Sequence, residues 1–262
     1  MNADSADQSS GIPLDGSLSV IIGGNQGIGA ALAQELGRHG SRVVIAGRNE
    51  RTLQETLAAL QDESVVADAR VMDLTDVDGV LEGCQQIIAD HGTPRLLVNA
   101  AGGSLKKDAL DVTPDEWDQL LDTHLRGTFF ASQTMAKAMV DVGYGKVLNF
   151  SSAWASTAAR GRSIYATAKA GVSHLTAALA VEWAPLGVRV NAIAPTATMT
   201  PRVQERHDSN PNAAAFSLAR IPLGRIAEVS DVVNASMFLA SESSDFITGQ
   251  TLYVDGGWQY AK

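Results

Sequence analysis

The sequence predicts an α/β protein in which helices cover both faces of a mainly parallel sheet. Short, continuously apolar segments alternate along the chain with longer segments whose apolar residues recur every three or four positions. Continuous apolar runs are typical of parallel strands, because helices bury both faces of such a sheet. The length of 262 residues and the hydrophobic content of 45% are sufficient for one large domain.

Each strand is predicted from a short apolar run, and each helix from apolar residues at three- and four-residue steps. The first pair shows the pattern, because SLSVIIGG is followed by IGAALAQELGRHG, whose helical spacing ends near Gly40. In chain order, the predicted strands are 17–24, 42–47, 69–74, a part of 94–103, 145–152, 188–195 and 250–257. The predicted helices are 28–40, 50–61, 114–140, 163–184 and 228–241.

Two segments fall outside this alternation. Residues 1–16 are polar and lack the basic start and apolar stretch of a secretory signal, so we predict a flexible lead-in. Residues 196–225 form the one long segment without a clear period, and a loop of this length is usually functional. The predicted organisation is a lead-in at 1–16 and a single catalytic domain at 17–262, with a substrate loop at about 196–225.

The composition excludes several classes of partner. A formal net charge of −9 and an isoelectric point near 5.0 argue against binding to nucleic acid or to an anionic membrane, because both require a basic face. No apolar run of the sequence is long enough to span a bilayer. The single cysteine, Cys84, excludes an intrachain disulfide and fits a reducing, cytoplasmic compartment. The histidines are scattered without the spacing of a metal site, so no metal is predicted.

The segment GGNQGIG at 23–29 follows the first predicted strand and opens the first predicted helix. Gly23, Gly27 and Gly29 permit a tight turn and lack the Cβ atoms that would hold a pyrophosphate away. The N-terminus of the following helix attracts phosphate through its unpaired N–H groups and its dipole. The strand before the turn and the helix after it therefore indicate a dinucleotide site.

The end of the second predicted strand indicates which dinucleotide is bound. A carboxylate there would accept hydrogen bonds from the adenosine ribose and repel a 2′-phosphate. The sequence instead has Gly47, Arg48 and Asn49 at this point. A guanidinium pairs well with a phosphate, so NADP(H) is the predicted cofactor. The alternative is that Arg48 is a solvated loop cation.

The segment SIYATAKAG at 163–171 places Tyr165 and Lys169 one helical turn apart. An unperturbed tyrosine has a pKa of about 10, and a neighbouring lysine favours the phenolate. Tyr165 then exchanges a proton with an alcohol or a carbonyl as a hydride moves to or from a nicotinamide ring. Ser152, at the end of the fifth predicted strand, donates a hydrogen bond to the same oxygen. For Tyr165 and Lys169 taken alone, the alternative is a solvent-facing helical pair.

In this order, the motifs resemble those of the short-chain dehydrogenase/reductase family from about Leu18 to Trp258. Further matches are NAAG at 99–102, RVNAIAP at 189–195 and ITGQTLYVDGG at 247–257. The resemblance implies a doubly wound Rossmann fold with a seven-stranded sheet. It also implies that Tyr165 is the catalytic acid/base, that Ser152 positions the substrate oxygen, and that Lys169 lowers the pKa of Tyr165 and holds the nicotinamide ribose.

The resemblance extends to the rest of the cofactor site. Asp73 and Leu74 match the pair that receives adenine, and Thr200 matches a residue that contacts the carboxamide. The predicted cofactor-binding residues are Gly23, Asn25, Gln26, Gly27, Ile28, Gly29, Arg48, Asn49, Asp73, Leu74, Asn99, Ala100, Gly102, Tyr165, Lys169, Pro195, Thr198 and Thr200. The candidates for the substrate pocket are Ser104, Trp154 and Met199, with structural packing as the alternative for the last two.

Three residues depart from the family pattern. Ile22 replaces a threonine that braces the glycine turn, and Thr196 follows Pro195 where the family has glycine. His124 stands where the family has an asparagine, which supports a water that leads protons from the lysine to solvent. Because histidine bonds water and also carries protons, His124 is predicted to be catalytic, and it preserves the relay, weakens it or gives it a new pH response. The alternative is a structural histidine with a backbone or water partner.

The sequence therefore predicts an NADP(H)-dependent oxidoreductase that interconverts a ketone and a secondary alcohol, with a small carbonyl or alcohol compound as its substrate. The alternatives are a dinucleotide-binding sensor or scaffold with little catalysis, an NAD(H)-preferring dehydrogenase, and a dehydratase or epimerase on the same scaffold. The resemblance also implies a homotetramer, with helix 228–241 and the last strand buried between subunits.

Overall fold

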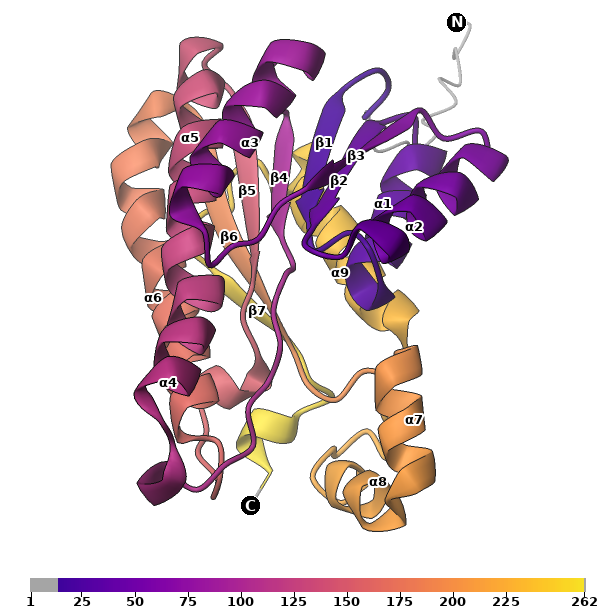
Figure 1. Ribbon diagram of the computed structural model, residues 1–262, viewed down its shortest axis with the longest axis vertical. Coiled ribbons are helices and arrows are strands. Elements are labelled where there is room, and N and C mark those ends of the chain that lie inside the picture. The colour runs from indigo at the N-terminus through magenta and orange to yellow at the C-terminus, as the bar shows by residue number, and fades with distance from the viewer. Residues whose placement is uncertain (1–13, 262) are drawn as a thin grey trace, which may run out of the picture.

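The computed structural model describes residues 14–261, except for the side chains of 211–214. Within these residues, a sheet of seven parallel strands lies between two layers of helices (Figure 1). The strands are β1 (Leu18–Ile22), β2 (Arg42–Gly47), β3 (Ala67–Val71), β4 (Leu96–Asn99), β5 (Gly145–Phe150), β6 (Val188–Pro195) and β7 (Thr251–Val254). Their order is β3-β2-β1-β4-β5-β6-β7, which confirms the predicted doubly wound fold.

Helices α1, α2 and α9 cover one face of the sheet, and α3, α5 and α6 cover the other (Figure 1). The helices are α1 (Gly27–Arg38), α2 (Glu50–Asp62), α3 (Val77–His91), α4 (Pro114–Leu121), α5 (Gly127–Asp141), α6 (Ser163–Trp183), α7 (Pro201–Ser209), α8 (Pro211–Leu218) and α9 (Val229–Ala240). Among the described residues, no helix is long and apolar enough to cross a membrane.

Consecutive strand residues enter the two cores of the molecule in turn. Val20 of β1 belongs to the core beneath α3 and α5, and the next residue, Ile21, belongs to the core beneath α1 and α9. Both side chains are fully buried. Because successive strand residues point to opposite faces, every position of β1 must be apolar or small, which explains the continuous apolar run.

The strand order reverses between β1 and β4, which are neighbours in the sheet but are separated in sequence by β2 and β3. Ile22, the last residue of β1, pairs with Asn99, the last residue of β4. Ligands of open α/β sheets bind beyond the carboxyl ends of the strands at this kind of reversal. The glycine turn follows β1 and the NAAG segment follows β4, so the topology brings both to one edge.

The prediction that residues 196–225 are irregular is wrong, because this segment contains α7 and α8. Each of these helices begins with a proline, Pro201 or Pro211, and the Thr200 side chain accepts a hydrogen bond from the Val203 N–H to cap α7. Helix α7 is strongly polar, so it lacks the apolar stripe that predicts a helix from sequence. Both helices lie beyond the carboxyl edge of the sheet (Figure 1).

Other predicted bounds also require correction. The helix predicted at 114–140 is interrupted by a π-helical turn at Asp122–Arg126, which separates α4 from α5. Helix α3 was not predicted, and the third strand ends at Val71 rather than at residue 74. Of the predicted lead-in, residues 1–13 lie outside the described residues, whereas Leu14 is 1% exposed and packs in the core.

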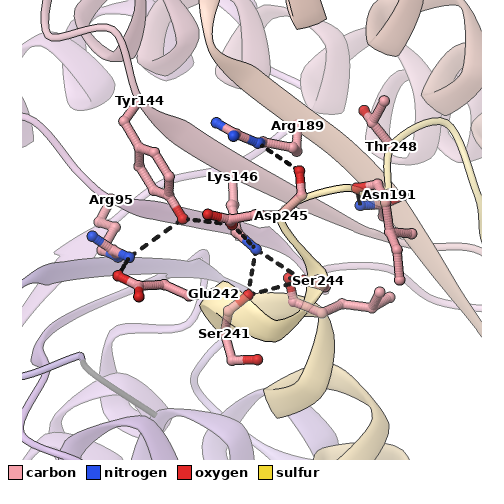
Figure 2. A network of polar contacts seen from close by, with 12 residues as sticks. Arg95, Tyr144, Lys146, Arg189, Asn191, Ser241, Glu242, Ser244, Asp245 and Thr248 are labelled. Carbon is pink, nitrogen blue, oxygen red and sulfur yellow. Dashed lines mark hydrogen bonds and ion pairs between the residues drawn. The ribbon is translucent and has the colours of Figure 1, made fainter.

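At the amino edge of the sheet, a polar network joins the starts of β4, β5 and β6 to the segment after α9 (Figure 2). Lys146 is 3% exposed, and its Nζ lies 2.8 Å from both Asp245 Oδ1 and Ser244 Oγ. The Arg95 guanidinium lies 2.7 Å from Glu242 Oε1. We call this group the basal network; its charged and phenolic members are Arg95, Tyr144, Lys146, Arg189, Glu242 and Asp245.

Candidate active site

The glycine turn after β1 is closed in by the backbone that follows β4. A Cβ on Gly23, whose φ is +89°, would lie 2.4 Å from the Ala101 nitrogen. A Cβ on Gly29 would lie 2.1 Å from the Gly23 carbonyl oxygen. Both positions therefore require glycine, and the first turn of α1 stays open to a ligand. This geometry fits the pyrophosphate of a dinucleotide.

A cleft of about 640 Å³ runs from this turn toward the ends of β2 and β3, and we call it the nucleotide cleft. It contains thirteen of the predicted cofactor residues, namely Gly23, Asn25, Gln26, Gly27, Ile28, Gly29, Arg48, Asn49, Asp73, Leu74, Ala100, Gly102 and Thr200. The sequence reasoning thus selected residues that the fold brings together, although they come from segments far apart in the chain.

Besides Arg202 of α7, the arginine that lines the nucleotide cleft is Arg48, which follows β2. It is exposed and, among the described residues, makes no ion pair, whereas the nearby Arg51 is bound by Glu55 at 2.5 Å. The Asn49 side chain accepts a hydrogen bond from the Thr52 N–H at 3.1 Å and so caps α2. Arg48 is consequently the residue whose charge is available to a ligand at this end of the cleft.

Three of the predicted catalytic residues lie together beyond β5. Ser152 follows this strand and is 5% exposed, and Tyr165 and Lys169 lie one turn apart near the start of α6. The Lys169 Nζ donates a hydrogen bond to the Phe150 carbonyl at 2.6 Å and lies 5.9 Å from the centre of the Tyr165 ring. The helical pair is therefore part of an enclosed cluster and does not face solvent.

The electrostatics of this cluster differ from the expectation that Lys169 lowers the pKa of Tyr165. Burial raises the pKa of Tyr165, and the groups that oppose this are the Ser152 hydroxyl, by hydrogen bonding, and the Arg162 charge. Burial also lowers the pKa of Lys169 to about 7. Since a lysine with this pKa is only partly charged at neutral pH, Arg162 is the permanent cation beside the phenol.

His124 lies in the π-helical turn and is 2% exposed. Its Nε2–H donates a hydrogen bond to the Gly103 carbonyl at 2.8 Å, so its Nδ1 is an acceptor, and this atom is buried without a partner in the described part of the chain. The ring stands edge-on to that of Tyr165, with 5.7 Å between the centroids. Burial and the Lys169 charge lower the pKa of His124 to about 3, so the ring is neutral at physiological pH.

Gly102 makes room for this histidine. Its φ is +150°, and a Cβ on it would lie 2.1 Å from His124 Cε1. The His124 ring therefore fits here only because position 102, in the NAAG segment, is a glycine. A side chain at position 102 would displace the imidazole from the Tyr165 ring.

A second cleft, of about 1600 Å³, continues from the catalytic cluster to α7, and we call it the substrate cleft. It is lined by Ser152, Tyr165, Lys169 and His124, together with the predicted residues Ser104, Trp154, Pro195, Thr198 and Thr200. Met199 is not among the described residues that line it, and its N–H binds the Ala227 carbonyl. Asn99 lies beneath the clefts, where its Nδ2 donates to Ser132 and Asn149.

Sequence reasoning missed several residues of the substrate cleft. Arg162, Arg206, Arg220 and Trp258 all line it, and the Trp258 ring packs against Trp154 with 4.7 Å between the centroids. For Arg162 a signal exists, because it precedes Tyr165 by three residues and so lies on the same side of the helix start. The other three come from α7 and from segments whose position only the fold defines. No group of His, Cys, Asp and Glu within the described residues is placed to hold a metal ion.

The fold, the glycine turn and the Ser–Tyr–Lys cluster define the class, an α/β oxidoreductase. The chain belongs to the short-chain dehydrogenase/reductase family. Residues 22–259 match the family model described as Enoyl-(Acyl carrier protein) reductase.

Curated relatives match nearly the whole chain. It is 34% identical to gluconate 5-dehydrogenase of Gluconobacter oxydans, over 93% of this chain and 95% of that one. It is 32% identical to the 3-oxoacyl-(acyl-carrier-protein) reductase FabG of Haemophilus influenzae, over 93% and 98%. Among solved structures, a gluconate 5-dehydrogenase from Burkholderia cenocepacia in complex with NADP and tartrate matches with a TM-score of 0.91 and 32% identity, covering 96% of this chain and 98% of that one.

Proposed function

We propose that the protein is an NADP(H)-dependent oxidoreductase that interconverts a ketone and a secondary alcohol, with Tyr165 as its acid/base. The observation that carries this proposal is the half-buried Tyr165, which lines the substrate cleft together with Ser152, Arg162 and Lys169. When bound, the nicotinamide cofactor supplies or accepts the hydride. Ser152 orients the substrate oxygen by hydrogen bonding, and Tyr165 donates the proton to it in reduction.

The neighbours of Tyr165 set its proton transfer. Burial alone keeps the phenol protonated, so the Ser152 hydrogen bond and the Arg162 charge are what favour the phenolate during alcohol oxidation. Lys169, with a pKa of about 7, exchanges protons readily at neutral pH. The free acceptor Nδ1 of His124 suits a bridging water on a proton path from Lys169, and the neutral ring supports that path without being protonated.

The preference for NADP(H) rests on Arg48, the cation that follows β2 in the nucleotide cleft and makes no ion pair among the described residues. Arg48→Ala is expected to raise the KM for NADPH by about 10-fold or more and to leave the KM for NADH nearly unchanged, because a guanidinium binds a 2′-phosphate through charge-assisted hydrogen bonds. Arg51→Ala is the matched control, since Glu55 already holds that guanidinium. An equal effect of Arg48→Ala on both cofactors would favour the NAD(H)-preferring alternative.

The proposed assembly is a homotetramer in the cytoplasm. Support for the assembly comes from apolar side chains exposed on and around α9 and β7, namely Phe238 at 42%, Leu252 at 38% and Phe246 at 105%. Apolar side chains of this size are typical of subunit interfaces when they lie together. Equilibrium sedimentation tests this proposal, and a single species of 27.5 kDa would reject it.

A further inference from the structure

The substrate cleft carries more positive than negative side chains, although the chain as a whole has a net charge of −9. The basic residues that line it are Lys106, Lys107, Arg160, Arg162, Lys169, Arg202, Arg206 and Arg220, and the acidic residues are Asp108 and Glu205. Since the rest of the molecule is acidic, the excess of cations at this one concave site suggests a ligand of opposite charge.

Two of these cations are already neutralised within the protein. Arg160 binds Asp108 with its Nε 3.0 Å from Oδ2, and Lys107 binds Glu116 at 2.8 Å. Arg220 lies over the Phe216 ring, 4.7 Å from its centre. Glu205 is exposed on α7. Arg160 and Lys107 therefore have counter-ions within the protein and do not require a charged ligand.

Arg162 differs from its neighbours in being both half-buried and unpaired. Among the described residues, no carboxylate lies within ion-pair distance of its guanidinium, which lies over the Trp154 ring at 5.5 Å from the centroid. Trp154 follows the catalytic Ser152 by two residues, and Arg162 precedes Tyr165 by three. The guanidinium therefore lines the same cleft as Ser152 and Tyr165.

A second guanidinium reaches the same place from α7. Arg206 lies close enough to Arg162 to lower its pKa by charge repulsion, in addition to the larger effect of burial. Arg206 also makes no ion pair among the residues that the structure describes. Two neighbouring cations without a counter-ion destabilise each other, and an anion placed between them removes the repulsion.

We propose that Arg162, assisted by Arg206, binds an anionic group of the substrate, a carboxylate or a phosphate, a few bonds away from the carbonyl that is reduced. This inference rests on the proposed ketone–alcohol chemistry and names the substrate class for the same site. The planar guanidinium of Arg162 suits two parallel hydrogen bonds to such a group, and its cation–π contact with Trp154 helps to hold it at the cleft. The contact orients the ketone between the Ser152 and Tyr165 hydroxyls.

The test compares ketones that differ only in charge. The first pair is 5-keto-D-gluconate and L-sorbose, which has a hydroxymethyl group in place of the carboxylate. The second pair is 4-oxopentanoate and its neutral amide. L-sorbose 6-phosphate, compared with L-sorbose, tests a phosphate in place of the carboxylate. With NADPH, we expect kcat/KM to be at least 10-fold higher for the anionic member of a pair. Arg162→Gln should lower the ratio of kcat/KM between the anionic and the neutral member to near 1, mainly by raising KM for the anionic ketone. The loss of its charge beside Tyr165 changes kcat of both members alike and leaves this ratio unaffected.

Controls separate this role from others of Arg162. Arg160→Gln, two residues away and paired with Asp108, should leave the ratio between charged and neutral ketones unchanged. Arg162→Lys should retain part of the ratio that Arg162→Gln loses, because lysine keeps the positive charge but cannot donate two parallel hydrogen bonds. An equal loss for charged and neutral ketones would overturn the proposal and leave Arg162 as a residue that only tunes Tyr165. The anion that the site prefers, carboxylate or phosphate, is the one whose ketone shows the larger kcat/KM relative to its neutral partner.

A binding measurement makes the test independent of turnover. In the Tyr165→Phe protein with NADP⁺, calorimetry with D-gluconate and D-sorbitol is expected to show tighter binding of the acid, and the additional Arg162→Gln change should abolish the difference. Equal responses to acid and polyol, including no binding of either, overturn the anion site. The proposed function fails separately, if the unaltered protein reduces no ketone of either charge with NADPH.

Discussion

The two edges of the sheet hold polar clusters that differ in how many of their groups have a partner within the protein. In the basal network at the amino edge, the Lys146 ammonium binds Asp245 and two serines, and the Arg95 guanidinium binds Glu242 (Figure 2). At the carboxyl edge, the His124 Nδ1 has no protein partner and Arg162 has no carboxylate among the described residues. The charged groups of the basal network bind one another, whereas the cluster at the carboxyl edge keeps an acceptor and a cation that are available to a ligand.

The difference separates groups that stabilise the fold from groups that bind ligands. A buried charge without a partner destabilises a folded chain, so a fold keeps one where a ligand supplies the missing partner. The basal network satisfies its charges internally, with the Arg95 Nε as the exception. Substitutions in the basal network should therefore change stability, and substitutions at the carboxyl edge should change activity.

The largest expected effect distinguishes two tyrosines, one from each cluster. Tyr165→Phe removes the acid/base group, and we expect turnover to fall by roughly 1000-fold or more with NADPH binding retained. Tyr144→Phe removes a phenol that donates to Asp245 at 2.9 Å, and we expect unchanged turnover with a loss of about 1 kcal/mol in the free energy of unfolding. Steady-state kinetics and urea unfolding of both variants measure this. Near-normal turnover of Tyr165→Phe would remove Tyr165 from the mechanism.

A second prediction concerns the buried ammonium of the basal network. Lys146→Met leaves the Asp245 carboxylate without its cation, and we expect the free energy of unfolding to fall by about 2–3 kcal/mol; the value is below that of a fully buried pair because Asp245 is partly exposed. The kcat/KM of the folded protein should not change. Lys137→Met, at an exposed position of α5, is the control and should match the unaltered protein. If Lys146→Met lowered activity without affecting stability, the division between the two edges would be wrong.

The smallest expected effect is a change in acid stability at His124. The unfolded chain protonates this residue near pH 6.5, whereas the folded protein keeps it neutral down to a pKa of about 3. Because the unfolded state binds more protons between these values, the free energy of unfolding decreases as the pH falls from 6.5 toward 3. His124→Asn should flatten this decrease in urea unfolding at pH 7 and pH 5, and the exposed His174→Asn should not. If the free energy of unfolding fell equally between pH 7 and pH 5 in His124→Asn and in the unaltered protein, burial would not lower the pKa of His124.

Much of the fold was predictable because its strands are buried on both faces. The predicted strands at 42–47 and 188–195 have the bounds of β2 and β6, and the glycine turn lies at the nucleotide cleft as its spacing indicates. Helix α7 was not predicted, because a polar helix at the rim of a cleft has no apolar stripe. The π-helical turn was missed as well, since a single inserted residue does not alter the apolar period enough to be recognised.

The candidate site was predictable only where a motif encodes it. Ser152, Tyr165 and Lys169 lie in recognisable segments, but the neutral state of His124 depends on its burial and on the Lys169 charge, against the opposing hydrogen bond to the Gly103 carbonyl. The cation beside the phenol was assigned to Lys169, whereas burial weakens that ammonium and leaves Arg162 as the permanent charge. Burial and charge pairing arise from packing, so the sequence alone does not reveal which cation remains unpaired.

The most direct test of the central claim, that the cluster at the carboxyl edge is catalytic, is the oxidation of NADPH across a panel of charged and neutral ketones, followed by the absorbance of the reduced nicotinamide. The account predicts that at least one ketone is reduced at a rate roughly 1000-fold above that of the Tyr165→Phe protein. Tight binding of NADPH with no turnover of any ketone would contradict it and would favour a dinucleotide-binding sensor or scaffold.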